Sequence, residues 1–299
     1  MRYNPVRTKG AFDQYAGAVL IFPALLVYLI FAVYPILNAI VLSFYDWNGI
    51  SLRSHFVGLD NYIAIFTRDS TFRIALQNTL VWVVLALLVP TSLSLALAVA
   101  LNESIFGRTI FRTVFYLPAI LAAIAVATMW TWIYNPSLGL ANEILRYLGL
   151  KEEYLPDWLG NERIALYSVF IAYVWQATGT PMILWLAGLQ GVPEELIDAA
   201  RVDGANRVQT FLHVTLPALR HTTIIVLSLT IINSLKVFDM IYGMTYGGPG
   251  QATNVLATWS YFKAFNGQDF GGGMAVATLL LLITMSIVLP YVLWMSRRE

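Results

Sequence analysis

The chain has 299 residues, of which 58% are hydrophobic and only 12% are charged, and its mean hydropathy is +0.67. Because about 25% of the residues in soluble globular proteins are charged, this composition excludes an ordinary soluble domain and indicates a protein embedded in a bilayer. A net charge of +1 gives nucleic-acid binding no electrostatic support, and the absence of cysteine excludes disulfides, thiolate metal ligands and cysteine nucleophiles.

Six apolar stretches are long enough to cross the hydrocarbon core of a bilayer, which requires about 20 helical residues. They run over residues 16–42, 74–101, 114–134, 164–188, 219–243 and 273–295. We therefore expect an all-α membrane protein in which residues 1–299 form a single transmembrane domain.

Prolines inside these stretches predict kinks, which membranes tolerate when neighbouring helices or water satisfy the freed carbonyls. They are Pro23, Pro35, Pro90, Pro118 and Pro181. The first stretch follows basic residues, as in a signal peptide, but it is too long for such a peptide and lacks a clear small-x-small cleavage site. We expect it to be retained as a membrane span.

The distribution of lysine and arginine predicts the orientation of the chain. With six spans, the larger share falls on one side: Arg2, Arg7, Lys9, Arg108, Arg112, Arg201, Arg207, Arg220, Arg297 and Arg298. The opposite loops hold fewer basic residues, diluted by acids such as Glu152, Glu153 and Asp157. The positive-inside rule then places both termini and the loop 189–218 in the cytoplasm.

That loop contains a polar segment, DAARVDGANRVQTFLHVTLP (198–217), between two strongly apolar stretches. We expect Pro193 to begin a helix of about three turns and Gly204 to end it in the left-handed conformation. Ala199 and Ala200 would let another protein surface approach the helix backbone closely. Charged residues would form a rim around them: Asp198, Arg201 and Asp203. The pattern predicts a docking helix, and the alternative is an ordinary amphipathic cytoplasmic helix.

The same loop resembles that of the permease subunits of binding-protein-dependent ABC importers. Their loop carries Glu-Ala-Ala, three residues, Gly, nine residues, a branched apolar residue, any residue, Leu and Pro. The corresponding positions here are Asp198-Ala199-Ala200, Gly204, Val214, Leu216 and Pro217, with aspartate in place of the usual glutamate. The resemblance implies a coupling helix that docks in a cleft of a separate ATPase, through Asp198, Ala199, Ala200, Arg201, Asp203, Gly204, Ala205 and Pro217.

A second signature lies in residues 236–265. Phe238-Asp239, Thr245, Gly247-Gly248-Pro249-Gly250, Thr253, Tyr261 and Ala264-Phe265 are similar to the carbohydrate-type permeases, which include the maltose and glycerol-phosphate importers. An Asn-Pro-Ser turn at 135–137 is typical of the same group. The resemblance covers nearly the whole chain and implies the type I ABC importer permease fold, with six transmembrane helices and a cytoplasmic coupling helix.

The resemblance also implies the partners. These are a second homologous permease in a heterodimer, two ATP-binding subunits, an extracytoplasmic solute-binding protein, membrane lipid and a carbohydrate. The location would be the cytoplasmic or inner membrane of a bacterium or archaeon. The chain has no Gly-x-x-x-x-Gly-Lys-Ser/Thr loop, so we expect ATP and magnesium on the partner ATPase and no cofactor on this chain.

Polar side chains within spans predict the substrate pathway, because such groups usually face a bundle interior or a water-filled path. Helical spacing puts Thr230, Asn233, Ser234 and Val237 on one face of the fifth span. In the resembling maltose permease, sugar contacts come from this face and from the middle of the fourth span. That position here holds Trp175, Gln176, Ala177 and Thr180. Asn78, Trp82 and Trp130 are further candidates. The alternative role for all of these residues is helix packing.

Other functions remain open at this point. Lys236 and Asp239 are three residues apart and could pair on one helix face, which would suit an ion-coupled secondary transporter, although no clear internal repeat is visible. An ABC importer permease for a non-sugar solute such as glycerol phosphate is another alternative. No nucleophile, base and orienting group can be assembled and the histidines lack metal-ligand spacing, so we expect neither an enzyme nor a metal site.

Overall fold

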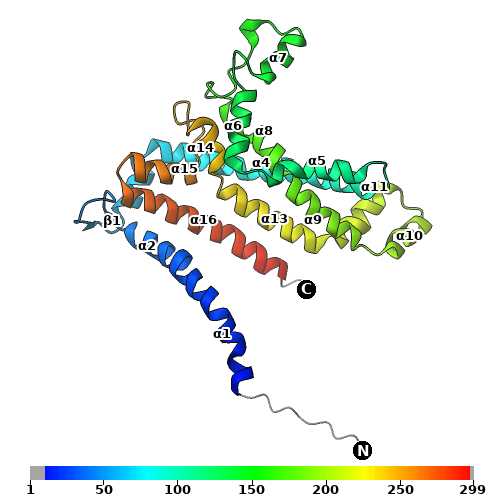
Figure 1. Ribbon diagram of the computed structural model, residues 1–299, viewed down its shortest axis with the longest axis horizontal. Coiled ribbons are helices and arrows are strands. Elements are labelled where there is room, and N and C mark those ends of the chain that lie inside the picture. Colours follow the sequence, from blue (N-terminus) through cyan, green and yellow to red (C-terminus); the bar gives the residue numbers. More distant parts are fainter. Residues whose placement is uncertain (1–10, 297–299) are drawn as a thin grey trace, which may run out of the picture.

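Long helices that run close to the longest axis of the molecule dominate the computed structural model, which describes residues 11–296 (Figure 1). Three unbroken segments of this described part are long and apolar enough to cross a membrane: Leu20–Leu42, Ser70–Asn102 and Phe270–Trp294. The number rises to six if each of three bent helix pairs counts as one span. The number of predicted spans matches this count only when each bent pair is taken as a single crossing. The third pair, Arg207–Ala218 with Arg220–Leu235, begins before the predicted stretch 219–243.

The all-α prediction is confirmed. The longer helices are α1 (Ala11–Tyr28), α2 (Tyr34–Leu42), α4 (Ser70–Asn102), α5 (Arg108–Ile120), α6 (Ala123–Ile133), α8 (Ala165–Ala177), α9 (Gly179–Gln190), α13 (Arg220–Leu235) and α16 (Phe270–Ser296). The shorter helices are α3 (Asp60–Thr67), α7 (Leu140–Tyr147), α10 (Glu194–Val202), α11 (Arg207–Thr210), α12 (Leu216–Ala218), α14 (Asp239–Thr245) and α15 (Leu256–Tyr261). Single turns of other helix types are η1 (Leu29–Val33), η2 (Glu152–Tyr154), η3 (Phe211–Thr215) and η4 (Phe262–Asn266). The described strands, β1 (Tyr45–Asp46) and β2 (His55–Phe56), form one antiparallel pair.

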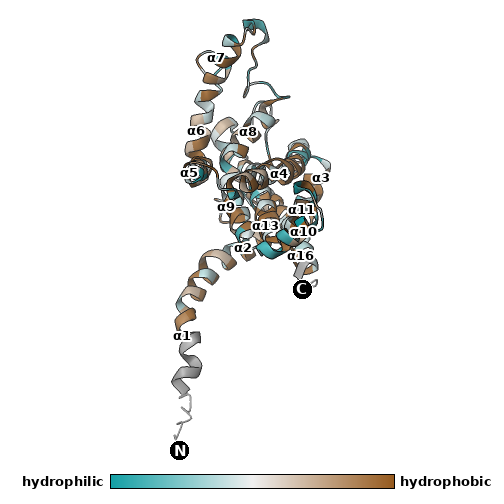
Figure 2. Cartoon of the chain, turned by 90° about the vertical axis from the view of Figure 1, so that its right-hand side faces the viewer, coloured by the Kyte–Doolittle hydropathy of each residue, from teal (hydrophilic) through white to brown (hydrophobic). Residues whose placement is uncertain are grey.

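The first span stands apart from the bundle. Helix α1 extends away from the other helices, and α2, which continues it in the same general direction, lies alongside α16 (Figures 1 and 2). No residue in the most apolar window of Leu20–Leu42 is buried within this chain. Its apolar surface is therefore available to lipid or to another protein. The helix changes to the wider η1 turn just before Pro35, one of the prolines predicted to cause a kink.

Helix α4 forms the spine of the bundle and continues without a break through Pro90. Proline has no N–H to offer the carbonyl of residue 86, which would normally lose its partner. The hydroxyl of Thr91 donates to that carbonyl of Ala86 at 3.1 Å and supplies the missing hydrogen bond. Helix α4 therefore stays continuous over 33 residues, although the sequence predicted a kink at Pro90.

Three predicted spans are interrupted, and in the stretch 164–188 the helices α8 and α9 are bent by 40°. Helices α5 and α6 meet at 100°, three residues after Pro118. Helix α13 ends at Leu235 and α14 begins at Asp239, so the predicted stretch 219–243 is not one helix. The new direction of α14 lets Met240, Ile241 and Met244 pack into a core shared with α6 and α8. Tertiary packing, rather than a helix-breaking residue, accounts for the interruption between α13 and α14.

Four apolar clusters among the described residues hold the bundle together, and two of them frame the cavity described below. One joins α4, α6, α8 and α14 around the fully buried Trp82, and the other joins α4, α9 and α13 around Met182 and Trp185. Gly188 of α9 permits a close approach, because a Cβ there would lie 2.9 Å from the Cβ of Thr222 on α13. These clusters fix α8–α9 against α13–α14, and the cavity described below lies between the two pairs.

The two ends of the molecule differ in character. Helices α10 and α11 lie at one end of the long axis, which we call the α10 end, and the β1–β2 pair lies at the opposite end (Figure 1). The hydropathy colouring shows α10 and α11 as strongly polar beside the apolar bundle (Figure 2). The end that holds β1, α15 and η4 is called the α15 end. Described helices α4, α9 and α16 all run towards the α10 end at their C-termini.

Candidate functional site

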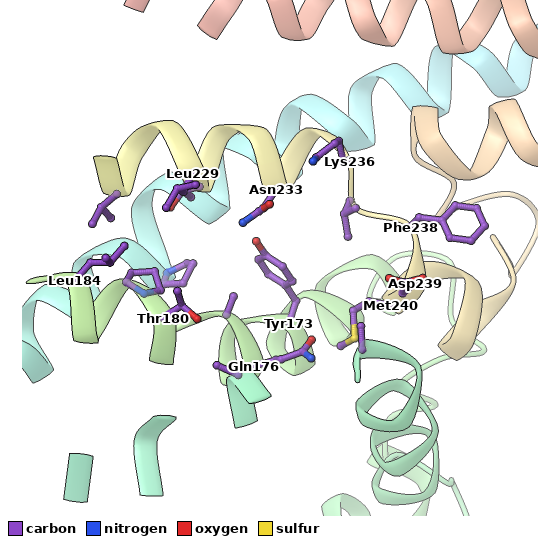
Figure 3. Close-up of a pocket in the computed structure, with 18 residues that line it drawn as sticks. Tyr173, Gln176, Thr180, Leu184, Leu229, Asn233, Lys236, Phe238, Asp239 and Met240 are labelled. Atoms are coloured by element: carbon purple, nitrogen blue, oxygen red, sulfur yellow. The ribbon is translucent and has the colours of Figure 1, made fainter. Parts of the chain in front are cut away.

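A cavity of about 500 Å³ lies between α8–α9 on one side and α13–α14 on the other. Its polar lining comes from both sides: Tyr173, Gln176, Thr180, Thr230, Asn233, Lys236 and Asp239. Figure 3 shows Asn233 on α13 and Tyr173 on α8 facing each other across this space. Pro90, Leu184, Leu229 and Met240 add apolar surface. The cavity therefore combines hydrogen-bonding groups with apolar walls, which is typical of a small-molecule site.

Two amide side chains in this cavity are held in different ways. The Nε2 atom of Gln176 donates to the carbonyl of Leu121 at 2.9 Å, and this carbonyl lies at the break between α5 and α6. Asn233 is exposed to the cavity and makes no side-chain hydrogen bond in the structure. The amide of Asn233 is thus free to bond a ligand, whereas Gln176 has only its remaining hydrogen-bonding capacity to offer.

The structure brings most of the sequence-predicted pathway residues together. Gln176, Ala177, Thr180, Thr230, Asn233 and Val237 all line the cavity. Two others lie outside it. Ser234 is fully buried and its hydroxyl donates to the carbonyl of Ile231, while the ring of Trp175 packs against Trp130 with centroids 6.0 Å apart.

The further pathway candidates in the second span have packing roles. The amide of Asn78 donates to the carbonyls of Ala252 and Asn254, both at 2.8 Å, and so ties α4 to the loop after α14. Trp82 is fully buried in the core. Neither residue lines the cavity.

Sequence reasoning missed Tyr173 and Met240 in the cavity lining. Tyr173 precedes Gln176 by three residues and Thr180 by seven, so helical spacing from these two residues could have identified it. Lys236 and Asp239 also line the cavity, but no ion pair joins them, because the helix ends between them. The predicted pairing on one helix face is therefore wrong.

The second candidate site is helix α10, and its C-terminus explains part of the sequence motif. Gly204 has a φ of +83° and follows the last helical residues, as the sequence predicted. The N–H of Ala205 donates to the carbonyl of Ala200, and the N–H of Gly204 donates to Arg201, each at 3.0 Å. This pair of bonds is the Schellman arrangement, which closes a helix on a left-handed residue. Helix α10 begins at Glu194 with Pro193 as its N-cap, so it starts one residue later than predicted.

The outward surface of α10 combines a small side chain with charged neighbours. Ala199 is exposed, and Ile197 on the other side of the helix packs towards the core of α4, α9 and α13. Asp198 and Arg201 form an exposed ion pair of 3.0 Å beside it. Asp203 and Pro217 are exposed, and Ala200 and Ala205 are half-buried. The predicted coupling residues therefore share one end of the molecule, with α10 resting on α11 and η3.

Apolar side chains on this polar loop were not singled out from the sequence. Leu196, Val202, Val208 and Leu212 are exposed by 49%, 88%, 65% and 49% respectively. Exposed apolar groups at a strongly polar surface mark a protein contact or a membrane contact. Val202 is the most exposed of the four and lies one helical turn from Ala199 on the outward face of α10. The signal in the sequence was the occurrence of large apolar residues within an otherwise polar segment.

Residues 89–298 match the model of the family described as binding-protein-dependent transport system inner membrane component. The match spans more than half of the chain and includes both the cavity and α10. The chain belongs to this family. It is a multi-pass membrane protein and a transport subunit.

Relatives support the same assignment along nearly the full length of the permease. It is 36% identical over 278 residues to a probable ABC transporter permease protein of Pyrococcus horikoshii, covering 93% of this chain and 94% of that protein. It is 34% identical over 275 residues to the trehalose/maltose transport system permease protein MalF of Thermococcus litoralis, covering 92% of each.

A solved structure shows the same fold. The permease aligns with a chain of the bacterial alginate ABC transporter in complex with an alginate pentasaccharide-bound periplasmic protein. The TM-score is 0.81 at 23% identity, and the alignment covers 95% of this chain and 96% of that chain. The chain therefore shares the overall fold of that transporter chain.

Proposed function

We propose that the permease carries a carbohydrate through the cavity between α8–α9 and α13–α14. The lining of this cavity is the observation that carries the proposal, because sugar recognition needs amide and hydroxyl groups for the sugar hydroxyls and an aromatic face for the ring. Asn233, Thr180 and Tyr173 supply these groups from opposite walls. The trehalose/maltose permease and the alginate transporter among the similar proteins support the same class of substrate.

ATP hydrolysis on separate subunits would supply the energy for transport. The sequence has no Gly-x-x-x-x-Gly-Lys-Ser/Thr loop, so two ATP-binding subunits would hold ATP and magnesium and leave this chain without a cofactor. Their docking surface would be the outward face of α10, with small Ala199 at its centre. The exposed pair of Asp198 and Arg201 would contribute polar contacts at its edge. Small side chains permit close approach of a partner, and the charges around them set its register.

A second, homologous permease subunit would complete the pathway as a heterodimer. Two features favour such a partner: the apolar helix pair α1–α2 has no buried residue in its most apolar window, and polar Asn233 is exposed in the single chain. Closure of the ATPase pair would move α10 as a rigid lever. The bundles would then rock around the cavity between inward-open and outward-open states.

The α10 end would face the cytoplasm of a bacterial or archaeal cell and the α15 end would face outwards, in the cytoplasmic or inner membrane. The bias of lysine and arginine towards the side that holds the loop 189–218 favours this orientation. An extracytoplasmic solute-binding protein would then deliver substrate to the α15 end, as a periplasmic protein accompanies the alginate transporter.

The cavity residues provide the test. We expect Thr180→Ala and Asn233→Ala to lower saccharide uptake about tenfold, since each removes a hydrogen bond of roughly 1.4 kcal/mol made in the transport path. Uptake of maltose and trehalose would be measured in proteoliposomes that contain the complete importer. The matched control is Thr113→Ala, because Thr113 is exposed on α5 and its hydroxyl bonds only to Thr109 of the same helix.

Unchanged uptake by both cavity variants would contradict the proposed pathway. Transport of glycerol phosphate in preference to every pyranoside tested would contradict the carbohydrate assignment.

A further inference from the structure

A second cavity, of about 460 Å³, lies at the α15 end between the loop after α14 and the turn η4. Its lining includes Tyr246, Gln251, Phe262 and Asn266. The ring of Tyr246 is 51% exposed, and its hydroxyl accepts a hydrogen bond of 3.1 Å from the amide of Asn266. An exposed tyrosine ring is thus held in a fixed position beside two amide side chains.

A row of aromatic rings joins this second cavity to the first. Phe238, Tyr242 and Tyr246 recur every four residues along α14 and its two flanking residues. The rings of Phe238 and Tyr242 stack at 5.2 Å with an interplanar angle of 18°, and the rings of Tyr242 and Tyr246 are 4.9 Å apart. Phe238 lines the first cavity and Tyr246 lines the second. We call Phe238, Tyr242 and Tyr246 the aromatic row.

Rings from α15 and η4 pack against the row. Tyr261 meets Phe238 and Tyr242 edge-on at 5.4 Å and 5.6 Å, and Phe262 lies 4.6 Å from Tyr246. Phe262 is buried, whereas all three members of the aromatic row keep part of their surface exposed. A cluster that served only to pack α14 against η4 would bury these rings instead of leaving Tyr246 half exposed.

The charged residues at the second cavity do not favour an anionic ligand. The ammonium of Lys263 lies 3.2 Å from a carboxylate oxygen of Asp69 and 3.1 Å from one of Asp269, so its charge is already balanced. Burial disfavours the charged form of Lys263, but the hydrogen bonds and charges of Asp269 and Asp69 outweigh it and raise the pKa of this lysine. Recognition there depends on ring surface and amides, which are the groups that contact the apolar face and the hydroxyls of a sugar.

We propose that the second cavity is a saccharide subsite and that the aromatic row is the track along which a sugar ring passes from this subsite to the membrane cavity. The inference rests on the proposed function and adds a site and a route to it. Tyr246 would stack against the first pyranose ring, with Gln251 and Asn266 beside it. The hydroxyl of Tyr242 would offer the next contact, and Phe238 would release the ring into the first cavity.

The test uses the complete importer in proteoliposomes with maltose and trehalose as probes. Tyr246→Ala is expected to raise the KM for uptake about tenfold and to change the maximal rate by less than about twofold, because one stacking contact of roughly 1 to 1.5 kcal/mol is lost. Tyr246→Phe keeps the ring and is expected to transport within about twofold of the wild type. The matched control is Tyr167→Ala, since Tyr167 is 50% exposed on α8 and lines neither cavity.

A second measurement separates sugar contact from docking. Saturation-transfer NMR on the importer without its binding protein is expected to show transfer to the ring protons of maltose or trehalose. Asn233→Ala is expected to leave a residual transfer signal, and adding Tyr246→Ala to that variant is expected to abolish this residual signal. The affinity for sugar-free binding protein should stay unchanged in Tyr246→Ala. Normal KM in Tyr246→Ala, equal defects in Tyr246→Phe and Tyr246→Ala, or weakened docking would each overturn the proposal. Failure of the wild type to transport any pyranoside would instead overturn the proposed function on which it rests.

Discussion

Two amide side chains of the membrane cavity, those of Gln176 and Asn233, have different roles. Gln176 both lines the cavity and bonds the carbonyl of Leu121 at the break between α5 and α6. Gln176→Ala is therefore expected to lower uptake and also to destabilise the permease by about 1 kcal/mol, because that carbonyl loses its donor. Asn233→Ala is expected to lower uptake with a change in stability of less than about 0.5 kcal/mol. Thermal unfolding in detergent distinguishes the two variants, and an equal loss of stability in both would contradict the assignment.

Helical spacing in the sequence identified Thr230, Asn233 and Val237 as neighbours, and the structure places all three at the cavity. It failed for Ser234, which is turned by about 100° from Asn233 on the helix and bonds to its own backbone. The width of a cavity is set by how neighbouring helices pack, and this information does not reside in one helix. Tyr173 could have been found by the same spacing on α8, whereas Met240 depended on the unforeseen turn between α13 and α14.

Among the elements, α10 was the most predictable, because its ends are encoded locally. A glycine at the C-terminus suffices to predict a left-handed closure, and the structure shows Gly204 at a φ of +83°. The 100° bend between α5 and α6 and the break between α13 and α14 were not predictable in the same way. Pro118 indicated a kink near the first break but not its size, and the second break follows from the packing of Met240 and Ile241 into the core.

Substitution of Gly204 tests α10 as an element. A Cβ at this position would meet no atom within 4 Å, so any effect of a larger residue arises from the left-handed backbone or from a partner. We expect Gly204→Val to distort the helix end at a cost of about 1 to 2 kcal/mol and to reduce the amount of ATPase that co-purifies with the permease. Gly204→Asn should assemble better than Gly204→Val, because asparagine tolerates the left-handed conformation.

The structure offers a matched control for this experiment. Gly149 follows α7 with a φ of +90° and also has nothing within 4 Å of a Cβ. Gly149→Val should leave ATPase assembly unchanged, although it imposes the same backbone strain. Equal losses in Gly149→Val and Gly204→Val would mean that strain alone, and not the docking surface, lowers assembly.

On the scale of the whole molecule, the permease chain by itself leaves apolar and polar surfaces uncovered. Its first span buries none of its most apolar window, and its cavity exposes polar side chains of α13 within the single chain. Its composition indicated a bilayer protein, but no sequence pattern showed that α1 would extend away from the bundle (Figure 1). Which surfaces meet lipid and which meet protein is decided by the assembled importer. We propose that the polar α10 end is the surface that contacts the ATP-binding subunits.

Cross-linking from α10 tests that connection most directly. Because the natural chain has no cysteine, Ala199→Cys introduces a unique thiol on the outward face of α10. Lys151→Cys introduces one just after α7, in the part of the chain that projects from the bundle away from α10 (Figure 1). With a photoreactive maleimide on each thiol in the intact complex, we predict a cross-link from position 199 to an ATP-binding subunit and none from position 151. Absence of that product at position 199, or labelling of Ala199→Cys by a membrane-impermeant thiol reagent added outside intact cells, would contradict the account.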